Sequence, residues 1–171
     1  MPPPPRRLLV ADAGPLIALG VAGLLAHTSA HFGGLWVPQA VMDECTGSTH
    51  APGAKEVAEA LAAKHLHVVE QSRILPLDAA YALGLGSGEA AVLAYARQHH
   101  YLALIDDQKA HTMAARLGVS TVRSGAVLLA LKAAGRVPSI APALDAFKRQ
   151  GYFLAPSVTN RLLQLAGEMQ D

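Results

Sequence analysis

Five carboxylates in the sequence have the residue types that metal chemistry needs. They are Asp12, Glu44, Glu89, Asp106 and Asp107. Carboxylates gathered at one edge of a sheet would repel one another and raise each other's pKa values, so such a cluster requires a positive partner. Ligand sets made only of oxygen atoms are typical of Mg²⁺ or Mn²⁺. Such ions activate water in phosphodiester cleavage, and a two-metal site would hold them roughly 3.5–4 Å apart.

Asp12 stands at the end of the first apolar run. Residues 8–11 predict a short buried strand, and Pro15 suits the first turn of a helix because its missing N–H is no loss there. The carboxyl end of a parallel strand faces the crevice in which open α/β sheets bind ligands. Two roles therefore stay open for Asp12. It is a group of the site if other carboxylates converge on it, and otherwise only the cap of the next helix.

The other four acids also stand beside apolar residues of a predicted strand or helix. Asp106 and Asp107 end an apolar run, so they project at the same sheet edge as the first aspartate if the two strands are neighbours. Glu44 and Glu89 each share a predicted helix face with apolar side chains. A carboxylate on the buried side of a helix is rarely left unpaired. We therefore expect both glutamates to face inward, toward a positive partner.

Short apolar runs alternate with helical patterns along most of the chain. Strands are expected over residues 8–11, 35–37, 66–69, 101–105 and 119–122. Helices are expected over 16–31, 38–44, 55–64, 90–99, 109–117 and 125–134, with Ser124 as the cap of the last and Asp78 as the cap of a further short helix. Polar residues interrupt the strand at 66–69, which favours the sheet edge. The alternation predicts a parallel sheet with right-handed crossovers and helices on both faces.

The alternation of strand and helix patterns ends at Pro138, and two helical patterns then cover residues 142–150 and 157–165. Their apolar positions predict a helical hairpin that packs on the sheet domain or on another subunit; they are Leu144, Phe147, Val158, Leu162 and Leu165. The expected organisation is a flexible Pro-rich leader over 1–7, an α/β domain over 8–137 and a C-terminal helical extension over 138–171, packed on the same domain. A homodimer through this extension or through the first helices is also expected.

Composition narrows the class of protein. A chain of 171 residues that is 51% hydrophobic can fill the core of one domain and is not a disordered protein. The net charge of +1 shows no general polycation, so a nucleic-acid partner must meet a local patch. The single Cys45 permits no internal disulfide and matches a cytoplasmic protein.

The apolar stretch over residues 8–26 superficially resembles a signal peptide or a membrane span. Asp12 inside it would cost roughly 2.5–3.5 kcal/mol at a bilayer centre. Gly14 and Pro15 also divide the stretch into a strand and a helix. We therefore predict no role in a membrane.

Four motifs in this order resemble a PIN domain. They are Leu-Val-Ala-Asp-Ala-Gly-Pro-Leu around Asp12, Val-Pro-x-x-Val-x-x-Glu ending at Glu44, Leu-Gly-x-Gly-Glu ending at Glu89, and Leu-Ile-Asp-Asp ending at Asp107. The resemblance covers about residues 8–132. More narrowly, the chain is similar to the toxin-like branch of prokaryotic PIN proteins, the VapC-like toxins of type II toxin–antitoxin systems, whose helical tail it shares.

The resemblance implies a Rossmann-like, three-layer α/β fold and a metal-dependent endoribonuclease that uses Mg²⁺ or Mn²⁺. It also implies an antitoxin protein as partner and RNA products with 5′-phosphate and 3′-hydroxyl ends. The family's metal-binding acids map onto Asp12, Glu44, Glu89 and one or both of Asp106 and Asp107, of which Asp107 is the more typical match.

The resemblance further implies that Ser124, where the family often has a small hydroxyl residue, orients a water or a phosphate. Arg123 stands where the family has glycine. The nearest cationic candidates for the RNA backbone are Lys109, Arg116 and Arg123. Each of these could equally be solvated surface charge.

A binding module that keeps the PIN fold for RNA or protein association, with little catalysis, is the main alternative. The complete set of acids favours the nuclease, because a degenerate site would typically have lost a carboxylate. Other chemistry is less well supported: the histidine pairs at 65/67 and 99/100 lack further ligands at tight spacing, and Cys45 lacks a matched histidine.

Overall fold

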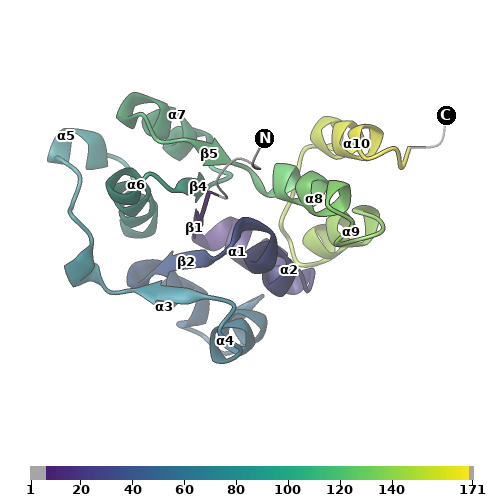
Figure 1. Cartoon of the computed structure of the whole chain (residues 1–171), viewed down its shortest axis with the longest axis horizontal. Coiled ribbons are helices and arrows are strands. Elements are labelled where there is room, and N and C mark those ends of the chain that lie inside the picture. The colour runs from purple at the N-terminus through teal and green to yellow at the C-terminus, as the bar shows by residue number, and fades with distance from the viewer. Residues whose placement is uncertain (1–6, 170–171) are drawn as a thin grey trace, which may run out of the picture.

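The computed structural model describes residues 7–169, and a five-stranded parallel sheet forms its centre. The strands lie in the order β3-β2-β1-β4-β5 (Figure 1). Their bounds are β1 Leu9–Ala11, β2 Leu35–Pro38, β3 His67–Val69, β4 Leu102–Leu104 and β5 Thr121–Val122. The predicted parallel sheet and the edge position of β3 are confirmed. Of the leader predicted over 1–7, all but Arg7 lies outside the described residues.

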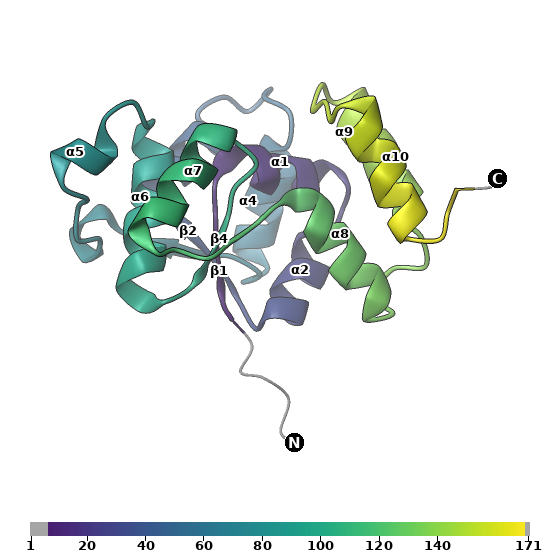
Figure 2. The same ribbon diagram turned by 90° about the horizontal axis from the view of Figure 1, so that it is seen from above.

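Helices cover both faces of the sheet, as the alternating pattern predicted. Figure 2 shows α6 and α7 on one side of the strands and α1, α2 and α8 on the other. The helices are α1 Ala13–Val21, α2 Leu25–Phe32, α3 Gln39–Thr46, α4 Ala54–Ala62, α5 Ala79–Ala82, α6 Ser87–His99, α7 Gln108–Leu117, α8 Ser124–Ala133, α9 Ala141–Arg149 and α10 Pro156–Leu165, with a 3₁₀ turn at Gln71–Arg73. The fold is therefore a three-layer, PIN-like α/β arrangement.

The order of the strands sets the place of the site. β1 lies at the centre, with β2 on one side and β4 on the other, and Leu9 pairs with both Leu35 and Leu102. The chain fills one half of the sheet before it crosses to β4 and β5. Such a switch point opens a crevice at the carboxyl ends of the two central strands. Asp12 follows β1 at this edge, and Asp106 follows β4.

The single helix predicted over 16–31 is wrong, because the structure has two helices there, bent by 117°. Gly23 has φ +71°, a left-handed conformation that side chains with a Cβ rarely adopt. The Gly23 N–H donates to Gly20 O and the Leu24 N–H donates to Leu19 O, each at 2.9 Å, which closes α1 as a Schellman motif. Gly23 therefore ends α1 within the stretch that was predicted as one helix.

The lengths of the helices bear on the prediction that the chain has no role in a membrane. No single helix within residues 7–169 is long and apolar enough to cross a membrane, and α1 with α2 would pass by length and composition only as a bent pair.

One predicted helix cap is confirmed in position and one is wrong. Asp78 occupies the cap position of α5, although its side chain makes no cap hydrogen bond within the described chain. α8 begins at Ser124 itself, with Arg123 at the cap position. Asp107 does cap its helix, because its Oδ1 accepts from the Ala110 N–H at 2.8 Å.

The C-terminal helices pack on the sheet domain: α9 contacts α1, and α10 contacts α8 (Figure 1). Leu144, Phe147 and Leu162 are buried as the pattern predicted. Val158 and Leu165 are instead exposed, by 46% and 56%. A Cβ at Gly125 in α8 would come within 2.8 Å of the Leu162 side chain, so glycine lets α8 and α10 approach closely.

Glu168 fastens the end of this hairpin. Its carboxylate pairs with Lys132 Nζ at 2.7 Å and accepts from Ser139 Oγ at 2.6 Å. It also accepts from the N–H groups of Ile140 and Ala141, at 2.8 and 3.0 Å, at the start of α9. Burial opposes ionisation of Glu168, but these donors outweigh it and lower its pKa to about 2. Glu168 thus joins the C-terminal end of the hairpin to α8 and to the start of α9.

We predict that Glu168→Ala lowers the free energy of unfolding by about 2–4 kcal/mol, because it leaves Lys132 and two N–H groups without their acceptor. In the wild type this contribution is present above the unfolded pKa, near 4.5, and is lost as pH falls toward about 2. Urea unfolding at pH 7 and pH 3 measures both effects. Glu59→Ala is the control, since its pair with Lys55 is exposed and 3.8 Å long. Equal losses in both variants would contradict the role of Glu168.

Candidate functional site

Asp12 is held at the carboxyl end of β1 and is only 9% exposed. Its N–H donates to Leu104 O at 3.0 Å, which ties the end of β1 to β4. Asp12 occupies the cap position of α1, yet within the described chain its side chain makes no cap hydrogen bond to that helix. The capping role left open by the sequence therefore does not account for the carboxylate.

Glu44 and Asp12 meet beside Gly88, in the first turn of α6. A Cβ placed on Gly88 would lie 3.3 Å from Glu44 Oε2 and 3.7 Å from Asp12 Oδ1. It would also lie 3.2 Å from Val41 Cγ2. Because glycine has no side chain, α6 can approach Val41 and the two carboxylates this closely. Glu44 itself is exposed, so the expectation that it faces inward was wrong, although its carboxylate does reach the site.

Glu89 lies next to Gly88 and is half-buried. Its Oε2 accepts from the Gly86 N–H at 2.9 Å, which closes the N-terminus of α6. This bond holds the side chain at the carboxyl edge of the sheet, where α6 begins.

The electrostatics of Asp12 show how closely the acids are grouped. Burial, and then the negative charges of Glu89, Glu44 and Asp107, raise the pKa of Asp12 to about 6, although the nearby Ala13 N–H opposes the rise. The structure therefore brings four of the five predicted acids into electrostatic contact around Asp12.

Asp106, the fifth acid, is held by hydrogen bonds from three other residues. Its Oδ1 accepts from the Ser124 N–H at 2.8 Å, and its Oδ2 accepts from the Tyr152 hydroxyl. Its main-chain oxygen accepts from Arg123 Nη1 at 2.7 Å. Asp107 is exposed and uses one oxygen, Oδ1, to cap α7. The neighbouring aspartates thus have different surroundings, which the sequence did not distinguish.

The predicted substrate-binding residues are spread more widely. Lys109 is in the first turn of α7, at the acid edge, and its Nζ lies 2.4 Å from where a Cβ on Gly84 would be. Arg123 also donates to Gln108 Oε1 at 2.6 Å, so part of its guanidinium serves the fold. Arg116 is in the last turn of α7, which returns to the opposite edge of the sheet, away from the acids.

Ser124 is fully buried. Within residues 7–169 its Oγ has no hydrogen-bond partner, although it lies near enough to the Tyr152 hydroxyl to affect its pKa. The Ser124 hydroxyl therefore does not reach a substrate at the surface in this arrangement, and the residue serves the site through its N–H group on Asp106.

The sequence analysis missed Tyr152. This residue follows α9, 46 positions after Asp106, and its ring packs on Phe147 with a centroid distance of 5.6 Å. A Cβ on Gly14 would lie 3.4 Å from the ring. No local pattern carries this contact, because it depends on how α9 docks on α1.

Cys45 is buried in α3 below the acids. Burial, followed by the charges of Glu44 and Asp12, raises the pKa of its thiol to about 12. A thiol so strongly protonated at neutral pH is not a nucleophile.

The donors fit a hard divalent ion by their chemistry, since they are carboxylate oxygens. As the side chains lie, no three His, Cys, Asp or Glu residues of the described chain are close enough together to hold an ion. Binding therefore requires a change of side-chain conformation, which the exposed Glu44 and Asp107 are free to make.

We predict that Asp12→Asn stabilises the protein at pH 8 without divalent ions, by about 1–3 kcal/mol. The folded pKa of Asp12, about 6, is above its unfolded value of 3.8, so its contribution to stability is full below pH 3.8 and is lost as pH rises through 6. The amide resembles the protonated acid and avoids this loss. Urea unfolding at pH 4 and pH 8 measures the difference, with the exposed Asp145→Asn as control. A gain of the same size at both pH values would contradict the prediction.

Comparison with known proteins agrees with this geometry. No curated protein matches the chain. A family model described as a PIN domain, DUF3368, matches residues 8–168, which include every predicted site residue and Glu168. PIN domains are generally nucleases. With nearly its whole length matched, the chain belongs to the PIN-domain family.

Proposed function

We propose that this protein is a metal-dependent endoribonuclease that hydrolyses phosphodiester bonds of RNA. The observation that carries the proposal is the grouping of Glu44, Glu89 and Asp107 around the buried Asp12, with Glu44 and Asp12 close to the same glycine, Gly88. Three of these carboxylates raise the pKa of the fourth, Asp12, so the group is costly to keep together without a cation. A PIN domain that retains them all is better explained as a nuclease than as a binding module.

Asp12, Glu44, Glu89 and Asp107 are the residues that would hold one or two Mg²⁺ or Mn²⁺ ions. Such an ion, when bound, lowers the pKa of water and neutralises charge on the reacting phosphodiester. Asp12 is held in place because its N–H donates to Leu104 O of β4. Glu89 is held by its bond to the Gly86 N–H. Glu44 and Asp107 are the adjustable members, because both are exposed.

Asp107 rather than Asp106 would be the ligand after β4. Both oxygens of Asp106 already accept hydrogen bonds, whereas Asp107 adds its charge to the group around Asp12. Lys109 and Arg123 stand at the same edge and would contact RNA phosphates. Arg116 would at most contact a distant part of a long RNA.

We further propose that the protein is the toxin of a toxin–antitoxin pair and acts in the cytoplasm. The support is the resemblance of its four motifs and its tail to VapC-like toxins. Co-purification of the tagged protein with the product of an adjacent gene, identified by mass spectrometry, tests for the antitoxin. Light scattering of the purified chain against its 17.8 kDa monomer mass tests for a homodimer.

The nuclease proposal predicts that the purified protein cuts a labelled single-stranded RNA with Mg²⁺ or Mn²⁺ and not with EDTA. Asp12→Asn should abolish cutting, and Glu44→Gln, Glu89→Gln and Asp107→Asn should each lower it by about 10-fold or more. Asp145→Asn, an exposed acid of α9, is the matched control and should cut as the wild type does. If wild type binds RNA but cuts none of a range of sequences in either metal, the binding-module alternative replaces the nuclease.

The close packing at Gly88 generates a separate prediction. Gly88→Ala should weaken Mn²⁺ binding by about 10-fold, since its methyl group would press on the Glu44 carboxylate beside Asp12. Stability should change little, because the preference of a helix for alanine over glycine, about 1 kcal/mol, offsets the tight contacts with Val41 and Glu44. Calorimetric titration with Mn²⁺ and thermal unfolding measure the two effects.

Gly20→Ala is the control for Gly88→Ala. It makes the same exchange inside α1, where the added Cβ would meet its neighbours at no less than 3.5 Å. Unchanged Mn²⁺ affinity in Gly88→Ala would show that the ion does not bind beside Gly88.

A further inference from the structure

We propose that Tyr152 is a positioning residue of the acid site, whose hydroxyl fixes the Asp106 carboxylate against the start of α8. This inference rests on the proposed nuclease function. It makes the segment between α9 and α10 part of the site, although that segment contributes no acid to it.

The contacts of Tyr152 place its hydroxyl among the acids. The hydroxyl donates to Asp106 Oδ2, while Ser124 N–H donates to Asp106 Oδ1 at 2.8 Å. The two oxygens of one carboxylate are therefore held from different elements. The hydroxyl would also lie 3.7 Å from a Cβ on Gly14, two residues after Asp12. Tyr152 thus lies between Asp106, after β4, and Gly14, in the first turn of α1.

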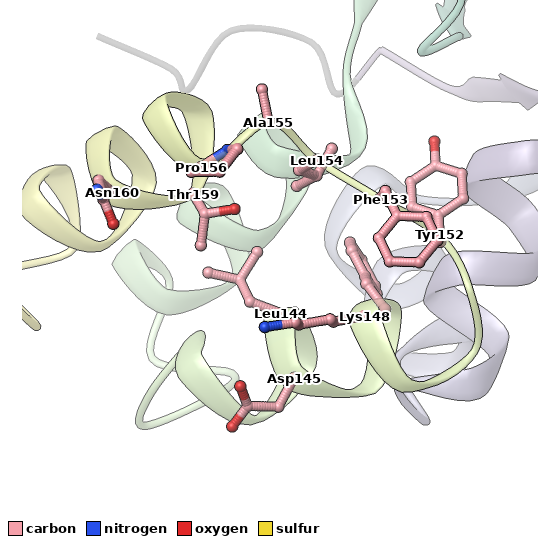
Figure 3. A pocket seen from close by; sticks show the side chains of 11 residues that line it. Leu144, Asp145, Lys148, Tyr152, Phe153, Leu154, Ala155, Pro156, Thr159 and Asn160 are labelled. Carbon is pink, nitrogen blue, oxygen red and sulfur yellow. The ribbon is translucent and has the colours of Figure 1, made fainter.

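The ring is held in this orientation by the C-terminal hairpin. It packs edge-on against Phe147, which is 1% exposed in α9. Figure 3 shows that the Tyr152 hydroxyl points away from a hollow of about 570 Å³ between α9 and α10, whose lining includes Leu144 and Lys148. The neighbouring Phe153 is instead 78% exposed. Of these two adjacent aromatic residues, only Tyr152 is directed into the acid site.

The phenol suits this place because it stays protonated. Burial, and then the charge of Asp106, raise the pKa of Tyr152 far above its usual value, and the nearby Ser124 hydroxyl opposes only part of the rise. A neutral donor can therefore bind Asp106 without cancelling its charge. Asp106 fixed in this way holds the backbone after β4 against the start of α8, and Asp107, the next residue, projects from that backbone.

Tyr152→Phe tests the proposal, because it keeps the ring and removes only the hydroxyl. We expect Mn²⁺ binding, followed by calorimetry or by the paramagnetic resonance of free Mn²⁺, to weaken by about 10-fold. The kcat for RNA cleavage should fall while KM for RNA changes little, since Tyr152 does not contact the strand. Tyr101→Phe, at the opposite end of β4, is the matched control and should change neither quantity.

Asp106→Asn alone and combined with Tyr152→Phe completes the test. If the tyrosine acts through Asp106, the double variant should bind Mn²⁺ about as weakly as Asp106→Asn does. Independent losses in the two single variants would overturn the proposed pairing. Unchanged Mn²⁺ affinity and kcat in Tyr152→Phe would overturn it while leaving the nuclease intact. A wild type that neither binds Mn²⁺ nor cuts RNA would overturn both proposals.

Discussion

The burial of one negative charge at the end of the central strand is the constraint on which the rest of this structure depends. Asp12 is 9% exposed, and three further acids add their charge to it. Each like charge makes ionisation of Asp12 costlier, so the arrangement works against stability unless a cation joins it. Active sites are commonly less stable than the surrounding fold would allow, because function needs groups that the fold alone would not place together. The edge of the sheet at which Asp12 and the three other acids meet is such a grouping.

The sheet order explains how acids from four segments reach one place. β1 is central and pairs with both β2 and β4, so its carboxyl end is beside the ends of both neighbours. α6 begins at the same edge and brings Gly88 and Glu89 to it. The tight packing there needs a residue without a side chain, and Gly88 meets this need. The position of the site is thus a consequence of strand order, and its composition is a consequence of which residues follow each strand.

Much of the fold could be predicted because its signals are local. Apolar runs indicate the strands, and their alternation with helical patterns indicates the layers. The break at Gly23 could not be predicted, because a glycine fits both the interior of an apolar helical pattern and a left-handed helix end. The acids could be predicted as a set, since chain order and strand ends locate them. The difference between Asp106 and Asp107 could not, because it depends on Ser124 and Tyr152, which are distant in sequence.

The sheet brings the acids together, whereas the C-terminal hairpin positions one side chain, Tyr152, that contacts Asp106. Glu168 ties the far end of the hairpin to α8 and α9 through Lys132 and main-chain N–H groups. Phe147 and Leu162 bury its inner face, and between these anchors the chain turns Tyr152 toward Asp106. A hydrogen bond to a site carboxylate is useful only if the donor does not move. The anchoring of both helices therefore keeps the tyrosine in place, so Glu168 supports the position of Tyr152 although it is not among the residues of the site.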